Sequence, residues 1–176
     1  MKDVDRRSFL TTALILTLLF CFCAAPSHCF AAEDAGDKLD KYAAAILGSF
    51  GDSVEAIQKK LGKPSIATAE KSPNPHYPEY TDVITTMKYD GVELAVYKSG
   101  YPGSKPFVIW LHCKTAKRKL RHFNVGGKVA GVRGVLGAPD DMEQSYVKYN
   151  SDLSGLSFQI TPDGTITEIE GYIFPD

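Results

Sequence analysis

The residue types that most often carry catalysis or hold metals gather around one predicted strand. His112 and Cys113 are adjacent, and His122 follows them closely. A cysteine beside a histidine can act as a nucleophile with its base, and the same three side chains could ligate a metal ion. Adjacent residues of a strand point to opposite faces of a sheet, so His112 and Cys113 cannot easily act together. We therefore predict structural roles for these residues, with no metal site and no cofactor.

A second candidate is the pair Asp140 and Asp141, which could supply an acid and a base. The pair directly follows Pro139, a residue that stops helices, and carboxylates at such a place are typical of solvated turns. The chain has no Gly-rich phosphate loop and no Cys-x-x-Cys, His-Glu-x-x-His or Gly-x-Ser-x-Gly motif. We therefore predict a non-enzymatic protein. The alternative is a small periplasmic hydrolase or ligand-binding enzyme that uses His112, His122 or Asp140/Asp141.

Length and composition narrow the function classes. The chain has 176 residues, of which 44% are hydrophobic and 23% are charged, and its formal net charge is -1. These values fit a globular protein and exclude a disordered, collagen-like or coiled-coil chain. A net charge this close to zero creates no strong positive electrostatic potential that would attract nucleic acid, so we expect no nucleic-acid partner. The basic run from Lys114 to His122 is either a patch for an anionic partner or a solvated helix face, and the acidic C-terminal part favours the second.

The first 31 residues have the features of an export signal peptide. A basic start precedes an apolar run over residues 13–25, which is shorter than the roughly 20 residues of a membrane-spanning helix. A twin-arginine signal is indicated by four residues: Arg6, Arg7, Phe9 and Leu10. The general secretory route and an uncleaved membrane anchor are the alternatives. We expect cleavage after residue 31, no stable membrane anchor after cleavage, and a periplasmic or secreted protein.

Two segments of the chain match each other. Residues 51–64 and 126–139 share Gly, Val, Ile or Val, Leu, Gly and Pro at equivalent positions. In both segments apolar residues recur at helical spacing, and a glycine followed closely by a proline is typical of a helix end. Each segment therefore predicts one short helix that ends at a glycine, and the pair suggests an internal repeat.

Predicted strands follow both of these helices. Residues 87–96 and 147–160 each read as a strand, a turn and an alternating strand. Another strand ends each half of the chain, at residues 107–113 and 165–174. Both halves therefore predict an antiparallel meander.

The predicted fold is α+β, with two tandem units over residues 32–113 and 114–176. A helix at residues 37–47 precedes the first Gly-capped helix, and by position residues 114–123 take the same place in the second unit. Each unit is then a helical pair packed on one face of an antiparallel β-meander.

A short motif of the first unit resembles a known module. Gly-x-Ser-Val-x-x-Ile-x-x-x-Leu-Gly-Lys-Pro, followed by a Tyr-Asp-Gly-Val strand turn, is similar to the SmpA/OmlA outer-membrane assembly lipoproteins and, in tandem, to β-lactamase-inhibitor-protein-like repeats. The resemblance covers residues 36–174 and implies helices packed on one face of an antiparallel sheet, whose open face serves recognition. The chain departs from both groups, because it lacks the lipidated N-terminal cysteine and the disulfide of each inhibitor repeat.

The strand at residues 107–113 shows where a partner could bind. Strict alternation divides its side chains between the two faces of the sheet: Phe107, Ile109, Leu111 and Cys113 toward the helices, and Val108, Trp110 and His112 on the open face. Trp110, the only tryptophan, would then lie beside Lys88 and Tyr97 on a face without helices. An aromatic anchor is typical of interface centres but also of cores, so a second core is the alternative.

Two loops rich in proline and tyrosine flank this strand surface, at residues 72–80 and 100–106. Such loops order at low entropy cost and present aromatic area, although a plain spacer between elements is the alternative. Their candidate contact residues are His76, Tyr77, Tyr80 and Tyr101. The sequence thus predicts an exported protein-recognition module, for envelope assembly or inhibitor-like binding, whose partner is a periplasmic or envelope protein.

Overall fold

The computed structural model describes residues 34–174. The predicted export signal, with Arg6, Arg7, Phe9 and Leu10, lies outside the described residues. Within residues 34–174, no helix is both long enough and apolar enough to cross a membrane.

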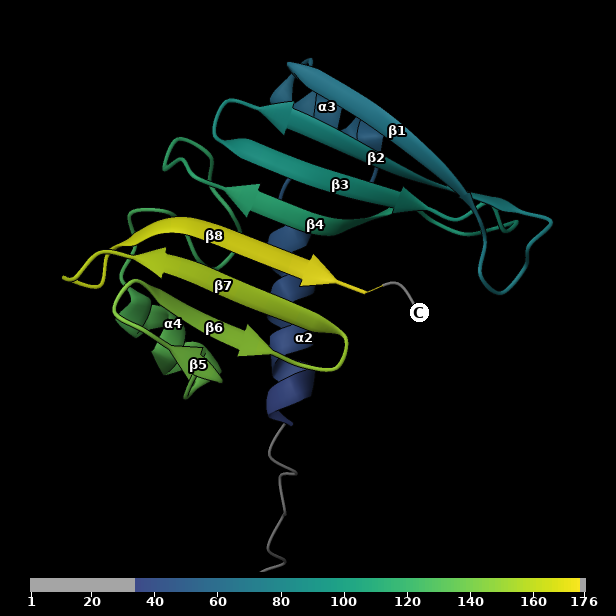
Figure 1. Ribbon diagram of the computed structural model, residues 1–176. Coiled ribbons are helices and arrows are strands. Elements are labelled where there is room, and N and C mark those ends of the chain that lie inside the picture. Colours follow the sequence, from purple (N-terminus) through teal and green to yellow (C-terminus); the bar gives the residue numbers. More distant parts are fainter. Residues whose placement is uncertain (1–33, 175–176) are drawn as a thin grey trace, which may run out of the picture. The chain divides into compact units, whose positions relative to one another are not determined.

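The described chain is built on one antiparallel sheet of eight strands (Figure 1). In chain order the strands are β1 (Ile66–Pro73), β2 (Thr81–Tyr89), β3 (Val92–Lys98), β4 (Phe107–Cys113), β5 (Asp141–Met142), β6 (Tyr146–Asn150), β7 (Ser154–Ile160) and β8 (Ile166–Ile173). Across the sheet they follow the order β1-β2-β3-β4-β8-β7-β6-β5. The predicted pair of tandem units, each with its own helical pair and meander, is wrong, because β4 pairs with β8 and joins all strands into one sheet.

Three helices accompany the sheet in the described residues: α2 (Ala35–Leu47), α3 (Val54–Leu61) and α4 (Val129–Leu136). The helix predicted at residues 37–47 and both Gly-capped helices are therefore present. Helix α2 lies behind the sheet in Figure 1 and contacts β7, β8, β4 and β6. Because a helix from the first half of the chain covers strands from the second half, the two halves do not fold as separate units.

The helix predicted over residues 114–123 does not form. Several of its backbone donors bind side chains instead, since Leu120 N–H donates to Asn124 Oδ1 at 2.9 Å and Arg121 N–H donates to Ser49 Oγ at 2.9 Å. His122 has a φ of 67°, a left-handed conformation that interrupts any helix. The basic segment from Lys114 to His122 is therefore an irregular connection between β4 and α4 and not a helix face.

Both short helices end at the glycines that their sequences predict, and a serine side chain caps the start of α3. At the start of α3, Ala56 N–H donates to Ser53 Oγ at 3.2 Å, which satisfies one of the backbone donors that a first helical turn leaves open. Both helices end at glycines with positive φ, 87° at Gly62 and 88° at Gly137. Side-chain-bearing residues rarely adopt this conformation, so glycine fixes both ends.

The hydrophobic core lies between the helices and one face of the sheet. Helix α2 contributes Ile46 and Leu47, and the strands contribute buried side chains such as Met87, Leu94, Leu111, Phe158 and Ile169. The short helices add Ile57 and Val132, which are 0% and 1% exposed. Burying each such side chain stabilises the fold by about 1.5–3 kcal/mol.

The two edges of the sheet differ. At one edge, β5 has only two residues. At the other, β1 has eight residues, all exposed, and pairs with β2 from Ile66 to Pro73 without a register shift. The sheet thus has one short edge and one long, regular edge.

Candidate functional site

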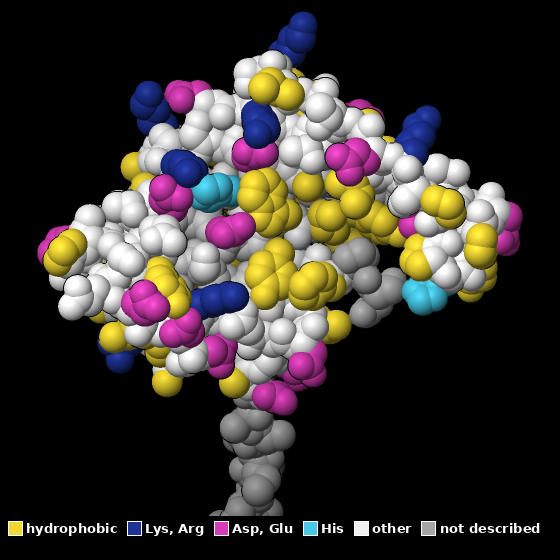
Figure 2. All heavy atoms as spheres, in the orientation of Figure 1, with side chains coloured by type: hydrophobic (Ala, Val, Ile, Leu, Met, Phe, Trp, Pro, Cys, Tyr) yellow, Lys and Arg dark blue, Asp and Glu magenta, His cyan; other side chains and the backbone are white. Residues whose placement is uncertain are grey.

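The sheet face turned away from α2 carries a group of aromatic side chains from β3, β4, β8 and the residue that follows β8. This group, which we call the aromatic patch, consists of Tyr97, Phe107, Trp110, Tyr172 and Phe174. Figure 2 shows this face, with hydrophobic side chains gathered near its middle. Phe174 is 59% exposed, and the other four side chains are partly exposed. The patch therefore offers apolar area to a binding partner.

Trp110 lies on a central strand of the sheet. It pairs with Ala95 of β3 on one side and with Tyr172 of β8 on the other. Its indole Nε1–H donates to Glu170 Oε1 at 2.7 Å. The ring is half-buried and is not part of the core beneath α2. Trp110 therefore has a fixed orientation and one accessible side.

A β-bulge changes the faces predicted for β4. Trp110 pairs with Ala95, but Val108 pairs with Val96, so Ile109 is an extra residue between the two pairs. As a result Val108 enters the core at 4% exposure, and Phe107 lies on the open face with its ring centroid 5.5 Å from that of Tyr97. The prediction was right for residues 110–113 and wrong for Phe107 and Val108, because alternation in a sequence does not reveal a bulge.

The two tyrosines of the aromatic patch are held by their hydroxyl groups. Tyr97 O–H donates to Asp82 Oδ2 at 2.7 Å, and Tyr172 O–H donates to Asn150 Oδ1 at 3.0 Å. The Tyr172 ring also lies directly over Gly155, where a Cβ atom would come within 2.5 Å of Tyr172 Cζ. Glycine is thus the residue that lets this ring lie against the backbone of β7.

A group of charges borders the aromatic patch. His112 Nε2 lies 2.8 Å from Glu168 Oε2, and Lys114 Nζ lies 3.3 Å from the same oxygen. The hydrogen bond with His112 lowers the pKa of Glu168, although partial burial acts in the opposite direction. The predicted site residue His112 is therefore on the open face, held by a carboxylate.

Two further charged residues of this face differ in their pairing. Lys88, another predicted site residue, forms an ion pair with Glu93 at 2.9 Å, directly opposite on β3. Glu170 accepts the hydrogen bond of Trp110, and no ion pair within residues 34–174 includes it. Glu170 thus places a carboxylate without a basic partner beside the tryptophan.

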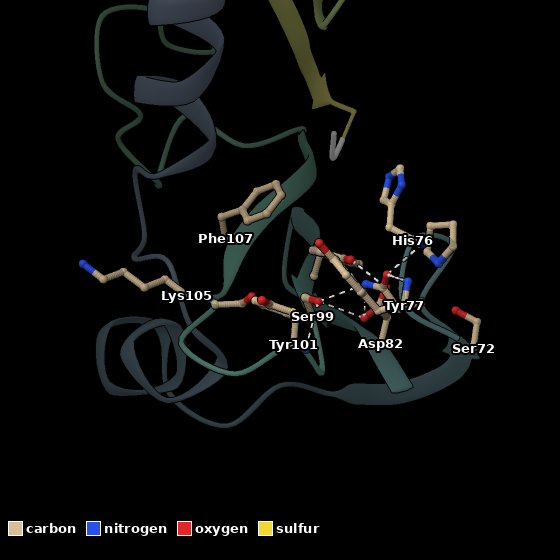
Figure 3. Close-up of a pocket in the computed structure, with 12 residues that line it drawn as sticks. Ser72, His76, Tyr77, Asp82, Ser99, Tyr101, Lys105 and Phe107 are labelled. Atoms are coloured by element: carbon tan, nitrogen blue, oxygen red, sulfur yellow. Dashed lines mark hydrogen bonds between the residues drawn. The ribbon is translucent and has the colours of Figure 1, made fainter. Parts of the chain in front are cut away.

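A buried carboxylate anchors one end of the patch to the neighbouring loops (Figure 3). Asp82, 3% exposed, accepts hydrogen bonds from Tyr97 O–H, Asn74 Nδ2, Ser99 Oγ and the backbone N–H of Gly100, at 2.7–3.0 Å. Burial raises the pKa of Asp82, but these four donors together outweigh it and lower the pKa to about 2. Asp82 is therefore ionised under ordinary conditions and joins β2 to two other segments, residues 97–100 and the loop that contains Asn74.

Asn74, which is hydrogen-bonded to Asp82, also fixes the loop between β1 and β2. Its Oδ1 accepts the backbone N–H groups of His76 and Tyr77, both at 2.9 Å. Tyr77, Tyr80 and Tyr101 then form one cluster, in which the ring centroid of Tyr101 is 4.6 Å from that of Tyr77 and 5.5 Å from that of Tyr80. The structure thus brings three of the predicted loop residues together, although they come from two different loops.

A hollow of about 520 Å³ connects the loops to the aromatic patch. Its walls include Tyr77 and Tyr101 from the loops and Tyr97 and Phe107 from the patch. The exposed side chain of His76 stands at the side opposite Phe107 (Figure 3). Loops and patch therefore form one continuous surface.

The residues considered for an enzyme lie in different surroundings. Cys113 is buried in the core, where burial raises the pKa of its thiol, while His112 is on the open face. His122 is exposed, and its ring centroid is 4.6 Å from that of Tyr42 of α2. A cysteine–histidine pair is therefore not assembled from these three side chains.

The aspartate pair is used in local hydrogen bonds. Asn150 N–H donates to Asp140 Oδ2 and Tyr146 O–H donates to Asp141 Oδ2, each at 2.5 Å. The second bond raises the pKa of Tyr146 to about 12. In the described part of the chain, no three His, Cys, Asp or Glu side chains are grouped so that they could hold a metal ion.

Sequence reasoning missed several residues that build this surface. Asp82 and Asn74 give no motif, because their partners are distant along the chain, although an asparagine before a proline does indicate a turn. Tyr172 and Gly155 could have been found only through the register of β7 and β8, which pairs them directly.

Comparison with known proteins gives no family for this chain. No family model and no curated protein matches it. Among solved structures, an extracellular protein containing a SCP domain from Bacillus anthracis str. Ames is similar at 10% sequence identity and a TM-score of 0.32. That match covers 73% of this chain and 45% of the other, so this chain spans less than half the length of the protein it matches. A likeness of this degree assigns neither a family nor a function.

Proposed function

We propose that this chain is an exported, non-enzymatic recognition module that binds a protein partner through the aromatic patch and the adjoining loops. The observation that carries the proposal is the set of five aromatic side chains on one sheet face that no helix of residues 34–174 covers. Export rests on the features of residues 1–31, and an SmpA/OmlA-like or inhibitor-like relationship rests on short motifs of the sequence.

The composition of the patch supports a role in binding. Tyrosine, tryptophan and phenylalanine dominate the energetics of protein interfaces, because each buries a large area at a small cost in side-chain entropy. Exposed apolar groups that adjoin one another on a soluble domain commonly mark an interaction site. Trp110 lies on β4, a central strand of the sheet, and Phe107 lines the hollow between the patch and the loops.

The hydrogen bonds of the patch support the same role. Tyr97, Trp110 and Tyr172 each have their polar group bound to an acceptor of the protein, at 2.7, 2.7 and 3.0 Å. The rings are therefore ordered before a partner arrives, and this reduces the entropy that binding must overcome. The tyrosine cluster of the loops is ordered in the same way through Asn74 and Asp82.

The charges beside the patch indicate the chemistry of the partner. Glu170 offers a carboxylate next to Trp110 that no basic residue of 34–174 pairs with, and Glu168 lies two residues away on the same strand. A protein segment with apolar side chains and a lysine or arginine fits this surface, because the basic group pairs with Glu170 while the apolar groups cover the rings.

The enzyme alternative has less support, since His112, Cys113, His122 and the Asp140/Asp141 pair are bound to separate neighbours. An affinity experiment decides between the readings. The immobilised chain should capture a specific protein from an extract of the source cell envelope, and Trp110→Ala should reduce capture at least tenfold, as expected for a hot-spot residue.

Leu153→Ala is the matched control for that experiment. Leu153 is a 42%-exposed hydrophobic residue outside the aromatic patch, so its removal tests for nonspecific adhesion. Equal loss of capture in both variants, or no loss in either, would refute the proposed surface.

A further inference from the structure

We propose that the chain forms a symmetric dimer in which strand β1 of one copy pairs antiparallel with β1 of a second copy. The proposal rests on the free edge of the sheet and not on the aromatic patch, so it is independent of the proposed function. It extends the eight-stranded sheet of each copy into one continuous sheet.

The first observation is that no other strand of residues 34–174 pairs with the outer edge of β1. Proteins usually block edge strands by making them short, by charged side chains, by a bulge, by a proline or by a covering element. The opposite edge follows this rule, because β5 has two residues. Strand β1 has eight exposed residues and a regular register, and its only proline is Pro73 at its last position. Its two charged residues, Glu70 and Lys71, are adjacent and of opposite sign, so they carry no net charge that would repel a second copy.

The second observation is the direction of the backbone groups of β1. Asn74 N–H donates to the carbonyl of Tyr80 at 2.9 Å, and Ser65 N–H donates to the carbonyl of Lys88 at 2.8 Å, so both of these carbonyls point toward β1. Backbone groups alternate along a strand, so the even-numbered residues of β2 and their partners on β1 bond each other. The N–H and C=O groups of Ala67, Ala69 and Lys71 therefore point outward, away from the sheet.

The third observation is that these outward groups are self-complementary. A two-fold axis beside Ala69 places Ala69 opposite Ala69 of the second copy, and Ala67 opposite Lys71. Every outward N–H of this stretch then meets an outward C=O, which forms about six hydrogen bonds. Pro73, which lacks an N–H, falls outside the paired stretch.

The side chains fit the same register. Residues that face each other across the axis are Ala69 with Ala69, Ala67 with Lys71, and Thr68 with Glu70. No like charges are opposed, and the closest pair at the axis consists of two methyl groups. An extended peptide of another protein could use the same backbone groups, but self-complementary hydrogen bonds without opposed like charges favour a second copy.

The dimer has a consequence for the open face. Because the two-fold axis of an antiparallel strand pair is perpendicular to the sheet, the open faces of both copies lie on the same side. If the proposed function is also correct, the dimer presents two aromatic patches to one partner surface and gains affinity by avidity.

The first test measures the oligomeric state of a chain that begins at residue 32, by analytical ultracentrifugation over a concentration series. The wild-type chain should show a concentration-dependent monomer–dimer equilibrium. Ala69→Pro removes one outward N–H without touching the bonds between β1 and β2, so it should shift the chain to monomer. Its unfolding midpoint should equal that of the wild type at low concentrations where both chains are monomeric. A wild-type chain that stays monomeric up to about 1 mM, a concentration that would reveal even a very weak dimer, overturns the proposal.

The second test separates a second copy from another occupant. Ala69→Glu and Ala69→Lys each place like charges opposite each other at the axis, so each variant alone should be monomeric. A mixture of the two should restore the dimer as a heterodimer, visible by native mass spectrometry. Ala44→Glu, an equal change at an exposed position of α2, should behave as the wild type does.

Hydrogen exchange gives an independent reading of the register. In the wild-type dimer, the amides of Ala67, Ala69 and Lys71 should be protected from exchange. In the Ala69→Pro variant, the amides of Ala67 and Lys71 should exchange fast. The amides of Thr68 and Glu70 bond β2 and should stay protected in both proteins. Three results would each refute a β1–β1 dimer. The first is a mixture of the Glu and Lys variants that remains monomeric, and the second is amide protection that does not follow this alternation. The third is a monomeric wild-type chain that binds extended peptides instead.

Discussion

Gly155→Ala tests whether the aromatic patch is held in place as described. A Cβ atom at residue 155 would lie 2.5 Å from Tyr172 Cζ and 2.6 Å from two further atoms of that side chain, so the ring must leave its place. Its displacement removes the hydrogen bond from Tyr172 O–H to Asn150, which contributes about 1 kcal/mol. Because Tyr172 belongs to the aromatic patch and pairs with Trp110, its displacement also disturbs the patch.

The expected loss of stability follows from these contacts. Partly uncovering the apolar surface of the Tyr172 ring costs about 1–2 kcal/mol, because full burial of a large apolar side chain contributes about 1.5–3 kcal/mol. Alanine loses less conformational entropy on folding than glycine does, and this offsets the loss of stability by about 0.5–1 kcal/mol. The free energy of unfolding, measured in urea, should therefore fall by about 1–2.5 kcal/mol.

Two comparisons make this result decisive. Gly134→Ala, in helix α4, meets no atom within 4 Å and should stabilise the protein by about 1 kcal/mol. In a double-mutant cycle, Gly155→Ala should cost nothing once Tyr172 has been replaced by alanine, because the clash is gone. Additive costs of the two substitutions would show that Tyr172 does not lie over Gly155.

Two further predictions concern the core and the loop anchor. Ile57→Ala should lower the free energy of unfolding by about 2–5 kcal/mol and Val132→Ala by about half as much, whereas a near-neutral effect of both in urea would contradict their burial at 0% and 1% exposure. Because the pKa of Asp82 falls from 3.8 to about 2 on folding, its ionised form stabilises the folded state fully above pH 3.8, and this contribution is lost as the pH falls toward 2. Thermal melts between pH 5 and 2 should therefore fall less steeply for Asp82→Asn than for the wild type, and parallel curves would contradict the network.

The helices and most strands could be predicted from local signals. Apolar spacing with a glycine at the end gave α3 and α4, because a positive φ at Gly62 and Gly137 is a local requirement. The turn between Tyr89 and Val92 was readable for the same reason. These features depend on residues that are close in sequence.

The assembly of those elements could not be predicted, because it depends on distant contacts. No local sequence pattern predicts that β4 pairs with β8, or that α2 covers strands from the second half of the chain. The predicted helix at residues 114–123 failed because side chains such as Asn124 and Ser49 take its backbone donors.

The candidate site divides in the same way. Alternation along residues 110–113 correctly placed Trp110 and His112 opposite Leu111 and Cys113. The bulge at Ile109 reversed the faces of the residues before it, and the partners of Tyr97 and Tyr172 became visible only with the strand register.

Fluorescence of Trp110 is the most direct test of the central claim, because the chain has no other tryptophan. In the isolated protein the emission should be partly quenched by iodide, since the ring is half-buried on the open face. Addition of the captured partner should protect Trp110 from iodide, while the Leu153→Ala variant should respond as the wild type does. Emission that iodide never quenches, or quenching that the partner leaves unchanged, would contradict recognition through the aromatic patch.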